Sequence, residues 1–330
     1  MQIVVAGRFD YIRFAWQKEI DSKKVMYFED GMFRSLTFKN KLVAKIEVIL
    51  SKFNKRKSEI YKNKGSLREY FDIDSLKRKD EILFILYETN FLTSDFELLH
   101  FLKSYYPKSK FVLDFTNAIG TVRQAVTKEI LNNIDFFDLV YTFNEIDAKR
   151  YGFGIFPDIS SDYSLIKEAD CEEFDVFFAG RAKERLEVIL SVAKRCLALG
   201  LKIRFYIVGV PNGAQEQIEG VYYTEYIPYL EMLSYIKKGK AVLNILNGVS
   251  SGIILRDEEA MGMNKVLITD TEYIFKTKYY TDSKIIPLSD LEQQAFKIIN
   301  QKDDEKWNCG AEDMNRLAFL KRVANNLTNK

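Results

Sequence analysis

Two loops in the second half of the sequence carry residues suited to holding phosphate groups. The first, residues 179–185, follows a predicted strand and opens a predicted helix, and it contains Gly180 and the three cations Arg181, Lys183 and Arg185. A glycine lets the backbone approach a ligand closely, and the N-terminus of a helix attracts anions. This loop therefore suits a diphosphate, although a tight turn with solvated charges explains the same residues equally well.

The second loop, residues 248–252, runs from a predicted strand into a predicted helix and consists of small and hydroxyl residues. Its backbone amides and the hydroxyls of Ser250 and Ser251, next to Gly252, can donate to phosphate oxygens. This loop is the second candidate phosphate site.

The helix that follows this loop carries a cation and an acid on one face. Arg256 can add a bidentate contact to phosphate. Glu259 lies one helical step further on, where a carboxylate can accept two hydrogen bonds from a ribose diol. The alternative interpretation of this pair is an intrahelical Arg256–Glu259 ion pair on a solvated face.

The elements that must position these loops are short apolar runs separated by helical periodicity. The runs lie at residues 2–6, 25–28, 82–87, 111–115 and 138–142, and again at 174–179, 203–208, 241–246 and 266–269. Near-continuous apolar strands between helices predict parallel sheets covered on both faces. We therefore expect an α/β protein with two facing Rossmann-like doubly wound domains and an interdomain cleft.

A stretch rich in Gly, Pro, Ser and Asp, residues 152–162, divides the two halves. The predicted domains cover residues 1–158 and 172–310. A C-terminal helix is expected over residues 311–330, with packing back on the N-terminal domain as one option for it. Ligands of such sheets bind beyond the carboxyl ends of the strands, so the loops there are the candidate sites.

Several segments resemble nucleotide-sugar glycosyltransferases of the GT-B type. Residues 258–270 (EEAMGMNKVLITD) are similar to the family's E-A-M-A-x-G-x-P-V-I-x-T element, and residues 177–181 (FFAGR) to its F-V-G-R phosphate loop. Residues 226–240, which begin with Tyr226, look like the stretch that precedes the nucleotide pocket. Residues 139–152 resemble the end of the N-terminal domain in bacterial lipopolysaccharide and capsule transferases.

This resemblance implies the GT-B architecture and transfer of a sugar from a nucleotide diphosphate sugar, with a UDP-sugar as the first candidate, to a bacterial surface polysaccharide or lipid-linked glycan. It places Arg181, with Lys183 or Arg185, at the diphosphate and Glu259 at the ribose. Ser251 stands where relatives with a retaining mechanism usually have an acidic residue, so the stereochemistry stays open.

GT-B relatives place acceptor groups on loops of the N-terminal domain. The resemblance thus implies an acceptor side built from Gly7, Arg8, Glu88 and Asn117, which follow the first, third and fourth predicted strands. An inverting transferase needs a base for the acceptor hydroxyl, and Asp10 is the preferred candidate. A helix N-cap is the alternative role for Asp10.

Neither a metal nor a cofactor is expected. Residues 72–74 (DID) form a D-x-D string, but they lie in a charged segment that does not follow a buried strand. Cations and helix dipoles can meet the diphosphate charge instead. A nucleotide-sugar epimerase of the same architecture and a non-enzymatic two-domain ligand-binding protein are the alternative functions.

The overall composition bounds the partners and the compartment. The 330 residues include 49 Lys and Arg against 47 Asp and Glu, a net charge of +2, which argues against a nucleic-acid binder. Three cysteines without a pairing pattern suit a reducing compartment, and neither a signal peptide nor a spanning segment is found, so a cytoplasmic protein is expected. Residues 41–57 predict a basic amphipathic helix, which either packs on the core or docks on anionic lipid at the inner face of the membrane.

Overall fold

The computed structural model describes residues 2–7, 9–28, 81–90, 99–100, 103–104, 106–120, 124–156, 161–246, 251–301, 305–308 and 315–328. The chain forms two compact units: Met1–Tyr141 together with Asn326–Lys330, and Thr142–Asn325. The predicted basic helix at 41–57 and the D-x-D string at 72–74 lie outside the described residues. Within the described part of the chain, no helix is both long and apolar enough to cross a bilayer.

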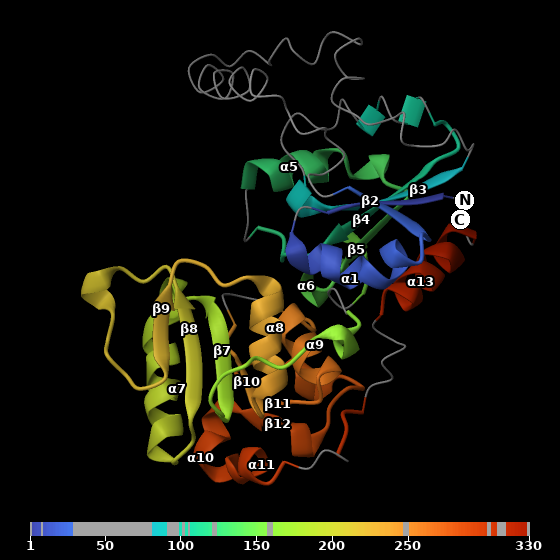
Figure 1. The fold of residues 1–330 in the computed structure, drawn as a ribbon. Helices are drawn as coiled ribbons and strands as arrows, with labels where there is room; N and C mark the ends of the chain where they lie inside the picture. The colour runs from blue at the N-terminus through green and yellow to red at the C-terminus, as the bar shows by residue number, and fades with distance from the viewer. Residues whose placement is uncertain are drawn as a thin grey trace. The chain divides into compact units, whose positions relative to one another are not determined.

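The first sheet has six strands in the order β2-β1-β3-β4-β5-β6 (Figure 1). Its strands are β1 (Gln2–Ala6), β2 (Val25–Phe28), β3 (Ile82–Tyr87), β4 (Lys110–Phe115), β5 (Leu139–Thr142) and β6 (Gly154–Ile155). The pairings of β1 with β2, β1 with β3 and β3 with β4 are parallel. Because every residue of β3 is buried, this central strand is covered on both faces, as its uninterrupted apolar run predicts.

Helix α1 (Asp10–Asp21) is bonded to the end of β3. The indole of Trp16 on α1 is fully buried and donates to the hydroxyl of Tyr87, the last residue of β3, over 2.7 Å. The helices α5 (Gln124–Asn132) and α6 (Glu145–Tyr151) follow β4 and β5 along the chain. This packing holds the residue that follows Tyr87 at a fixed place beyond the sheet.

The second sheet also has six strands, in the order β12-β11-β10-β7-β8-β9, and all five neighbouring pairs are parallel. Its strands are β7 (Val176–Arg181), β8 (Ile203–Val208), β9 (Val221–Thr224), β10 (Ala241–Asn244), β11 (Val266–Thr269) and β12 (Ile285–Pro287). The helices are α7 (Leu186–Ala198), α8 (Tyr229–Lys238), α9 (Leu255–Gly262), α10 (Leu291–Gln294), α11 (Phe296–Ile299) and α13 (Arg316–Thr328).

Helices cover both faces of this sheet. On one face, Val176 and Phe178 of β7 join a buried apolar cluster with residues of α7, including Ile189. On the other face, Phe177 stacks on Tyr235 of α8 with ring centroids 5.8 Å apart. The alternation of neighbouring residues between two covered faces is the doubly wound arrangement that the sequence predicts.

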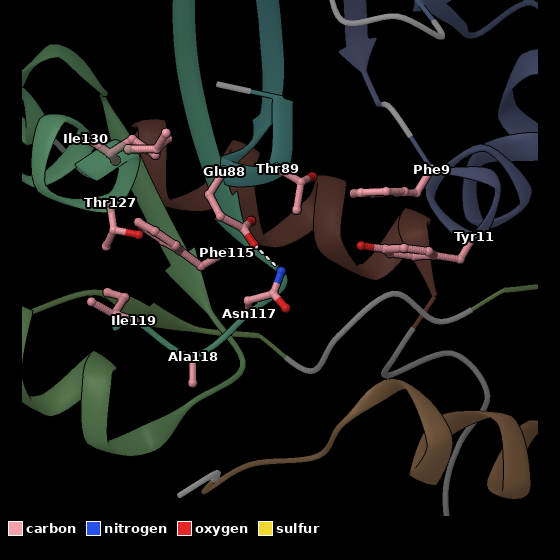
Figure 2. Close-up of a pocket in the computed structure, with 11 residues that line it drawn as sticks. Phe9, Tyr11, Glu88, Thr89, Phe115, Asn117, Ala118, Ile119, Thr127 and Ile130 are labelled. Carbon is pink, nitrogen blue, oxygen red and sulfur yellow. Dashed lines mark hydrogen bonds between the residues drawn. The ribbon is translucent and has the colours of Figure 1, made fainter. Parts of the chain in front are cut away.

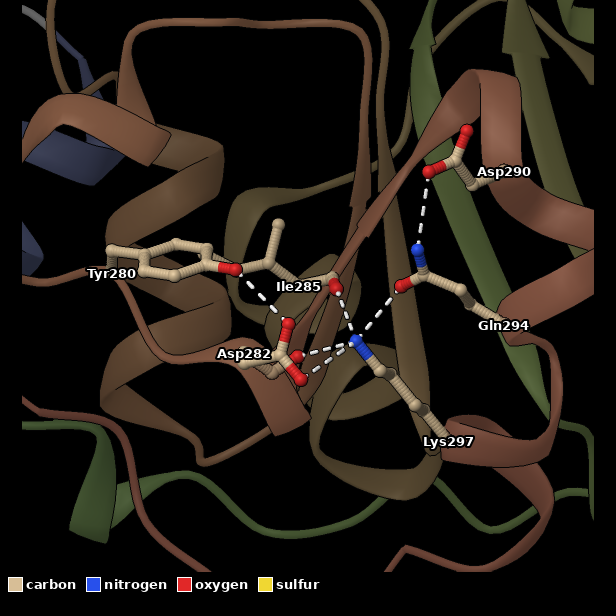
Figure 3. Close-up of polar contacts among 6 residues, drawn as sticks. All are labelled: Tyr280, Asp282, Ile285, Asp290, Gln294 and Lys297. Atoms are coloured by element: carbon tan, nitrogen blue, oxygen red, sulfur yellow. Dashed lines mark hydrogen bonds and ion pairs between the residues drawn. The ribbon is translucent and has the colours of Figure 1, made fainter.

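Lys297 on α11 ties this helix to the segment around β12 (Figure 3). Its ammonium donates to the backbone carbonyl of Asp282 at 2.6 Å, to that of Ile285 at 3.2 Å and to Oε1 of Gln294 at 2.8 Å. Within the second unit, Arg322 of α13 donates to the carbonyl of Ile155, and within the first unit, Asn326 donates to the hydroxyl of Tyr141.

Candidate functional site

A pocket of about 250 Å³ opens at the carboxyl ends of the strands of the first unit (Figure 2). The chain order reverses between β1 and β3, and a reversal of this kind is where open parallel sheets bind ligands. The pocket is lined by Phe9, Tyr11, Glu88, Thr89, Phe115, Asn117, Ala118, Ile119, Val126, Thr127 and Ile130. Residues that follow β1, β3 and β4 therefore meet at one site.

The carboxylate of Glu88 is the chemically distinctive group of this pocket. Glu88 begins a short 3-10 helix directly after β3, and only 9% of its surface is exposed. Its Oε2 accepts from the backbone amide of Thr116 at 2.8 Å, and its Oε1 accepts from Nδ2 of Asn117 at 2.7 Å and from the Thr116 hydroxyl at 3.1 Å. All three donors are uncharged.

These surroundings place the ionisation of Glu88 near neutrality. Burial raises the pKa of Glu88 from 4.5 to about 7, while the hydrogen bonds from Thr116 and Asn117 oppose that rise. The charge of Asp114 on β4 adds a smaller increase. A carboxyl group of this kind can exchange a proton at physiological pH, which is the property required of a general acid or base.

Two aromatic rings border the same pocket. Phe9 and Tyr11 stack with ring centroids 5.5 Å apart and an angle of 9° between their planes. Figure 2 shows the two rings lying one above the other beside Glu88 and Thr89. The Tyr11 hydroxyl and Oγ1 of Thr116 form a hydrogen bond of 3.3 Å, which links the aromatic pair to the residue that binds Glu88.

The predicted acceptor residues are partly brought together here. Glu88 and Asn117 line the pocket, whereas Gly7 is buried and does not belong to the lining; a Cβ there would collide with the Tyr27 hydroxyl and with Ile12. The predicted base, Asp10, is exposed in the first turn of α1 and does not belong to the pocket lining, and the N-cap position is held by Phe9. Arg8 lies outside the described residues.

In the second unit, the first predicted phosphate loop begins inside a strand. Gly180 and Arg181 are the last two residues of β7, whereas the sequence predicts that the strand ends at residue 179. The side chains of Arg181 and Lys183 are exposed, and Lys183 has a φ of 44°, in the left-handed region. The backbone thus turns sharply before α7 and leaves two cations open to solvent.

Arg185 bridges the point where the order of the second sheet reverses, between β7 and β10. Its guanidinium donates to the carbonyl of Arg181 at 2.7 Å and to the carbonyl of Ile245, which follows β10. Burial lowers the pKa of Arg185, while the charge of Asp270 opposes that effect. In this conformation, Arg185 cross-links the two strands beside the predicted phosphate site.

The structure contains the ion pair that the sequence offers as the alternative to a ribose contact. Nη1 of Arg256 lies 2.5 Å from Oε2 of Glu259, and the Glu259 side chain is 1% exposed. Arg256 also donates to the carbonyl of Ala179 at 3.1 Å. Burial raises the pKa of Glu259, and both Arg256 and a hydrogen bond from Tyr229 oppose that rise. A ribose could reach this carboxylate only if neighbouring side chains moved.

The second predicted phosphate loop is described only at its end, because residues 247–250, including Ser250, lie outside the described part. The carbonyl of Ser251 accepts from the amide of Glu145 at 2.6 Å, and its hydroxyl accepts from the amide of Ile146 at 3.1 Å. Ser251 therefore satisfies the first amides of α6. Gly252 lies against the backbone carbonyl of Phe143, where a Cβ would not fit.

Tyr226 is 66% exposed in the segment between β9 and α8. Its amide and carbonyl both bond to the Thr224 hydroxyl. The phenol ring itself is therefore open to solvent at the carboxyl end of β9.

Phe9 and Thr116 belong to the loops after the first and fourth predicted strands, which the sequence offers as candidates, but the sequence does not single them out, and Tyr11 lies outside those loops. One available signal is the helix start, because Phe9 is the N-cap of α1 and makes no side-chain capping bond. Ser, Thr, Asp or Asn is strongly preferred at such a position. A departure from local preference of this kind is typical of functional sites.

The structure also shows whether side chains are grouped so that they could bind a metal ion. Among the described residues, no three His, Cys, Asp or Glu side chains gather closely enough to hold a metal ion.

No protein-family model matches the sequence, and no curated protein matches it either. Solved structures do match the fold. A UDP-forming α,α-trehalose-phosphate synthase from Burkholderia xenovorans has a TM-score of 0.55 at 12% identity, and the match covers 100% of this chain and 99% of that one.

Two further structures match over nearly their whole length. A UDP-GlcNAc 2-epimerase from Neisseria meningitidis, bound to UDP-GlcNAc, has a TM-score of 0.51 at 11% identity, with 100% of both chains covered. A trehalose-6-phosphate protein from E. coli, bound with UDP-2-fluoro glucose, has a TM-score of 0.51 at 10% identity, with 99% of this chain and 95% of that chain covered. At these identities the likeness concerns the fold, and the chain has the two-domain α/β fold of the GT-B type.

Proposed function

We propose that this protein is a glycosyltransferase that moves a sugar from a nucleotide diphosphate sugar to a hydroxyl group of a glycan. The observation that carries the proposal is Glu88, a buried carboxyl group with a pKa of about 7 in a pocket where the sheet order reverses. A base in that position suits removal of a proton from an acceptor hydroxyl, because its pKa lies near the operating pH.

In the proposed step, the ionised Glu88 carboxylate accepts the proton of the acceptor hydroxyl while that oxygen bonds to the anomeric carbon of the donor sugar. The bond between the anomeric carbon and the diphosphate oxygen breaks, and the nucleoside diphosphate leaves with the electron pair. Direct attack of this kind inverts the configuration at the anomeric carbon. Thr116 and Asn117 hold the carboxylate in place with uncharged donors and so leave it basic.

The second unit is the proposed donor side. The exposed cations Arg181 and Lys183 at the end of β7 suit the charge of the leaving diphosphate. A UDP-sugar is the first candidate donor, since proteins of the same fold are bound to UDP-GlcNAc and to UDP-2-fluoro glucose. Ser250, Gly252 and Tyr226 are proposed to contact the nucleotide sugar, and Glu259 is proposed to contact the ribose after the side chains that cover it have moved.

The proposed class of acceptor rests on the resemblance of residues 139–152 to bacterial surface-glycan transferases. It names a surface polysaccharide or a lipid-linked glycan as the acceptor. A lipid-linked acceptor would bring the protein to the inner face of the cell membrane, and the basic segment 41–57 would assist that approach.

Product analysis tests the proposal against an epimerase, a function found in one of the proteins with this fold. The protein is incubated with a panel of UDP-sugars, with and without a mixture of glycan acceptors, and the products are separated by mass and by sugar identity. A transferase releases UDP and extends the acceptor only in the second reaction. Conversion of one UDP-sugar into another without acceptor would overturn the proposal in favour of the epimerase. Binding of UDP-sugars with no product in either reaction would identify a ligand-binding protein.

A further inference from the structure

We infer that the pocket of the first unit binds a pyranose ring laid against Phe9, so that the acceptor is a pyranoside glycan. The inference deepens the proposed function and rests on it for the reaction. The binding itself depends only on the pocket. Three independent features of the pocket carry it.

The first feature is the position of Phe9. This large apolar side chain is 44% exposed, and its residue occupies the N-cap of α1, where it caps nothing with its side chain. An exposed aromatic ring gains little from burial, and a phenylalanine at an N-cap forgoes the bond that a serine or aspartate would make there. Stacking on Tyr11 accounts for one face of the ring. The exposed part of the ring is left for a ligand to cover.

The second feature is the rigidity of the ring. Phe9 stacks face to face on Tyr11, and the Tyr11 hydroxyl is tied to Thr116. Thr116 in turn donates to Glu88. The aromatic face and the carboxylate are therefore held in one network, and Figure 2 shows them bordering the same space. A preorganised surface of this kind loses little entropy when a ligand binds.

The third feature is the match between the pocket and the chemistry of a pyranose. A pyranose presents an apolar face of C–H groups, which carry partial positive charge and pack on the negative face of an aromatic ring. Its rim carries hydroxyls, and the pocket that Phe9 lines is also lined by Glu88 and Asn117, which offer a carboxylate and an amide. The buried Thr89 hydroxyl has no hydrogen-bond partner among the described residues and can take one from a sugar.

An acyclic polyol or an alkyl chain would use either the polar groups of the pocket or its aromatic face, but not both. A polyol has the hydroxyls without a rigid apolar face, and an alkyl chain has the reverse. The pocket combines both within about 250 Å³. We therefore assign it to a ring that combines both.

The experiment is saturation-transfer NMR on the full-length protein with methyl glycosides of glucose, galactose and N-acetylglucosamine as probes. Sorbitol and octanol serve as the acyclic and alkyl controls, and uridine serves as the planar control. We expect at least one pyranoside to bind and the controls to give no comparable signal. Phe9→Leu, which keeps apolar bulk and loses the aromatic face, should weaken that pyranoside about tenfold. Phe9→Trp should retain it.

The outcomes separate the two proposals. Equal pyranoside binding by the parent and by folded Phe9→Leu would overturn the inference, as would tighter binding of uridine, sorbitol or octanol at this pocket. Absence of pyranoside binding by the parent would overturn it as well. Sugar transfer to a furanoside glycan would then leave the proposed function standing without the inference. Pyranoside binding that depends on Phe9, with no transfer from any UDP-sugar, would keep the inference and overturn the transferase.

Discussion

Two buried glutamates, one in each unit, differ in the groups to which they bond. Glu88 follows β3 in the first unit and, among the residues that the structure describes, accepts from uncharged donors on Thr116 and Asn117. Glu259 lies on α9 in the second unit and pairs with the guanidinium of Arg256. Glu88 also lines a pocket, whereas Glu259 has a side chain that is 1% exposed.

Burial raises the pKa of both carboxyl groups, but Glu88 lines a pocket whereas Glu259 faces a guanidinium, so we expect a reactive acid in the first case and a structural acid in the second. Neutral hydrogen bonds hold a carboxylate in place without cancelling the effect of burial, so its proton affinity rises into the physiological range. An arginine favours the ionised form directly, and its removal leaves an uncompensated buried charge. We therefore expect changes at Glu88 to affect catalysis most and changes at the Arg256–Glu259 pair to affect stability most.

The largest expected effect is the loss of activity in Glu88→Gln. A general base contributes about 10²- to 10⁴-fold to a rate, so kcat for sugar transfer should fall within that range. Steady-state kinetics with a saturating donor measures it. Asp10→Asn is the matched carboxylate control because Asp10 is exposed outside the pocket lining, and it should retain more than half of the parent rate. If Asp10→Asn caused the larger loss, Asp10 would be the base, as the sequence predicts.

The next effect is on folding. Arg256→Ala should lower the free energy of unfolding by about 3 kcal/mol, because it leaves the Glu259 carboxylate buried without its cation. Urea unfolding measures the change. The double variant Arg256→Met, Glu259→Gln removes both charges and should recover much of that loss. A cost below about 1 kcal/mol for Arg256→Ala would mean that water reaches Glu259 in solution, and would favour its predicted role as a ribose ligand.

The sequence predicts the fold more completely than it predicts the site. Uninterrupted apolar runs such as residues 82–87 identify buried parallel strands, because only a strand covered on both faces has that pattern. The site depends on contacts between distant segments: Glu88 meets Thr116 and Asn117 only after β3 and β4 pair. The sequence names Glu88 and Asn117 by their positions after strands.

The choice of base could not be made from the sequence, because it depends on burial. Asp10 and Glu88 both follow predicted strands, and nothing in the sequence shows that one carboxyl group is exposed and the other buried. Phe9 could have been noticed as an unusual N-cap only with the exact start of α1 in hand. Helix boundaries are uncertain by one or two residues even when a structure is known.

A smaller effect is expected on donor binding. Arg181→Ala should weaken the affinity for UDP by about 1.5–3 kcal/mol, the usual contribution of a hydrogen bond from a charged group. Calorimetry with UDP measures the affinity. Lys194→Ala is the control, because this cation lies on α7 in an exposed ion pair with Glu216. An unchanged affinity for UDP in folded Arg181→Ala would show that the diphosphate does not bind at the end of β7.

The last expected effect is a dependence of stability on pH, to which buried carboxyl groups of both units contribute. Burial raises the pKa of Glu88 from 4.5 to about 7, and it raises the pKa of Asp257 on α9 from 3.8 to about 7. The folded protein therefore holds these two protons more tightly than the unfolded chain does. Between about pH 4.5 and 7 the unfolded chain loses them first, so stability falls as pH rises.

The expected slope is about 1.4 kcal/mol per pH unit for each group within that window. Activity should move in the opposite direction, because the proposed base acts only when Glu88 is ionised, so kcat should rise with pH and level off above about 7. Asp257→Asn should remove the contribution of Asp257 to the dependence of stability on pH and leave the midpoint of the pH–rate curve unchanged. Glu88→Gln should remove the contribution of Glu88 to the dependence of stability on pH, and it should also abolish the pH–rate curve. Urea unfolding and kcat, each measured from pH 4.5 to 8, test both statements. A midpoint of activity near pH 4.5 would mean that Glu88 is exposed to water in solution, and its distinction from an ordinary surface carboxylate would be lost.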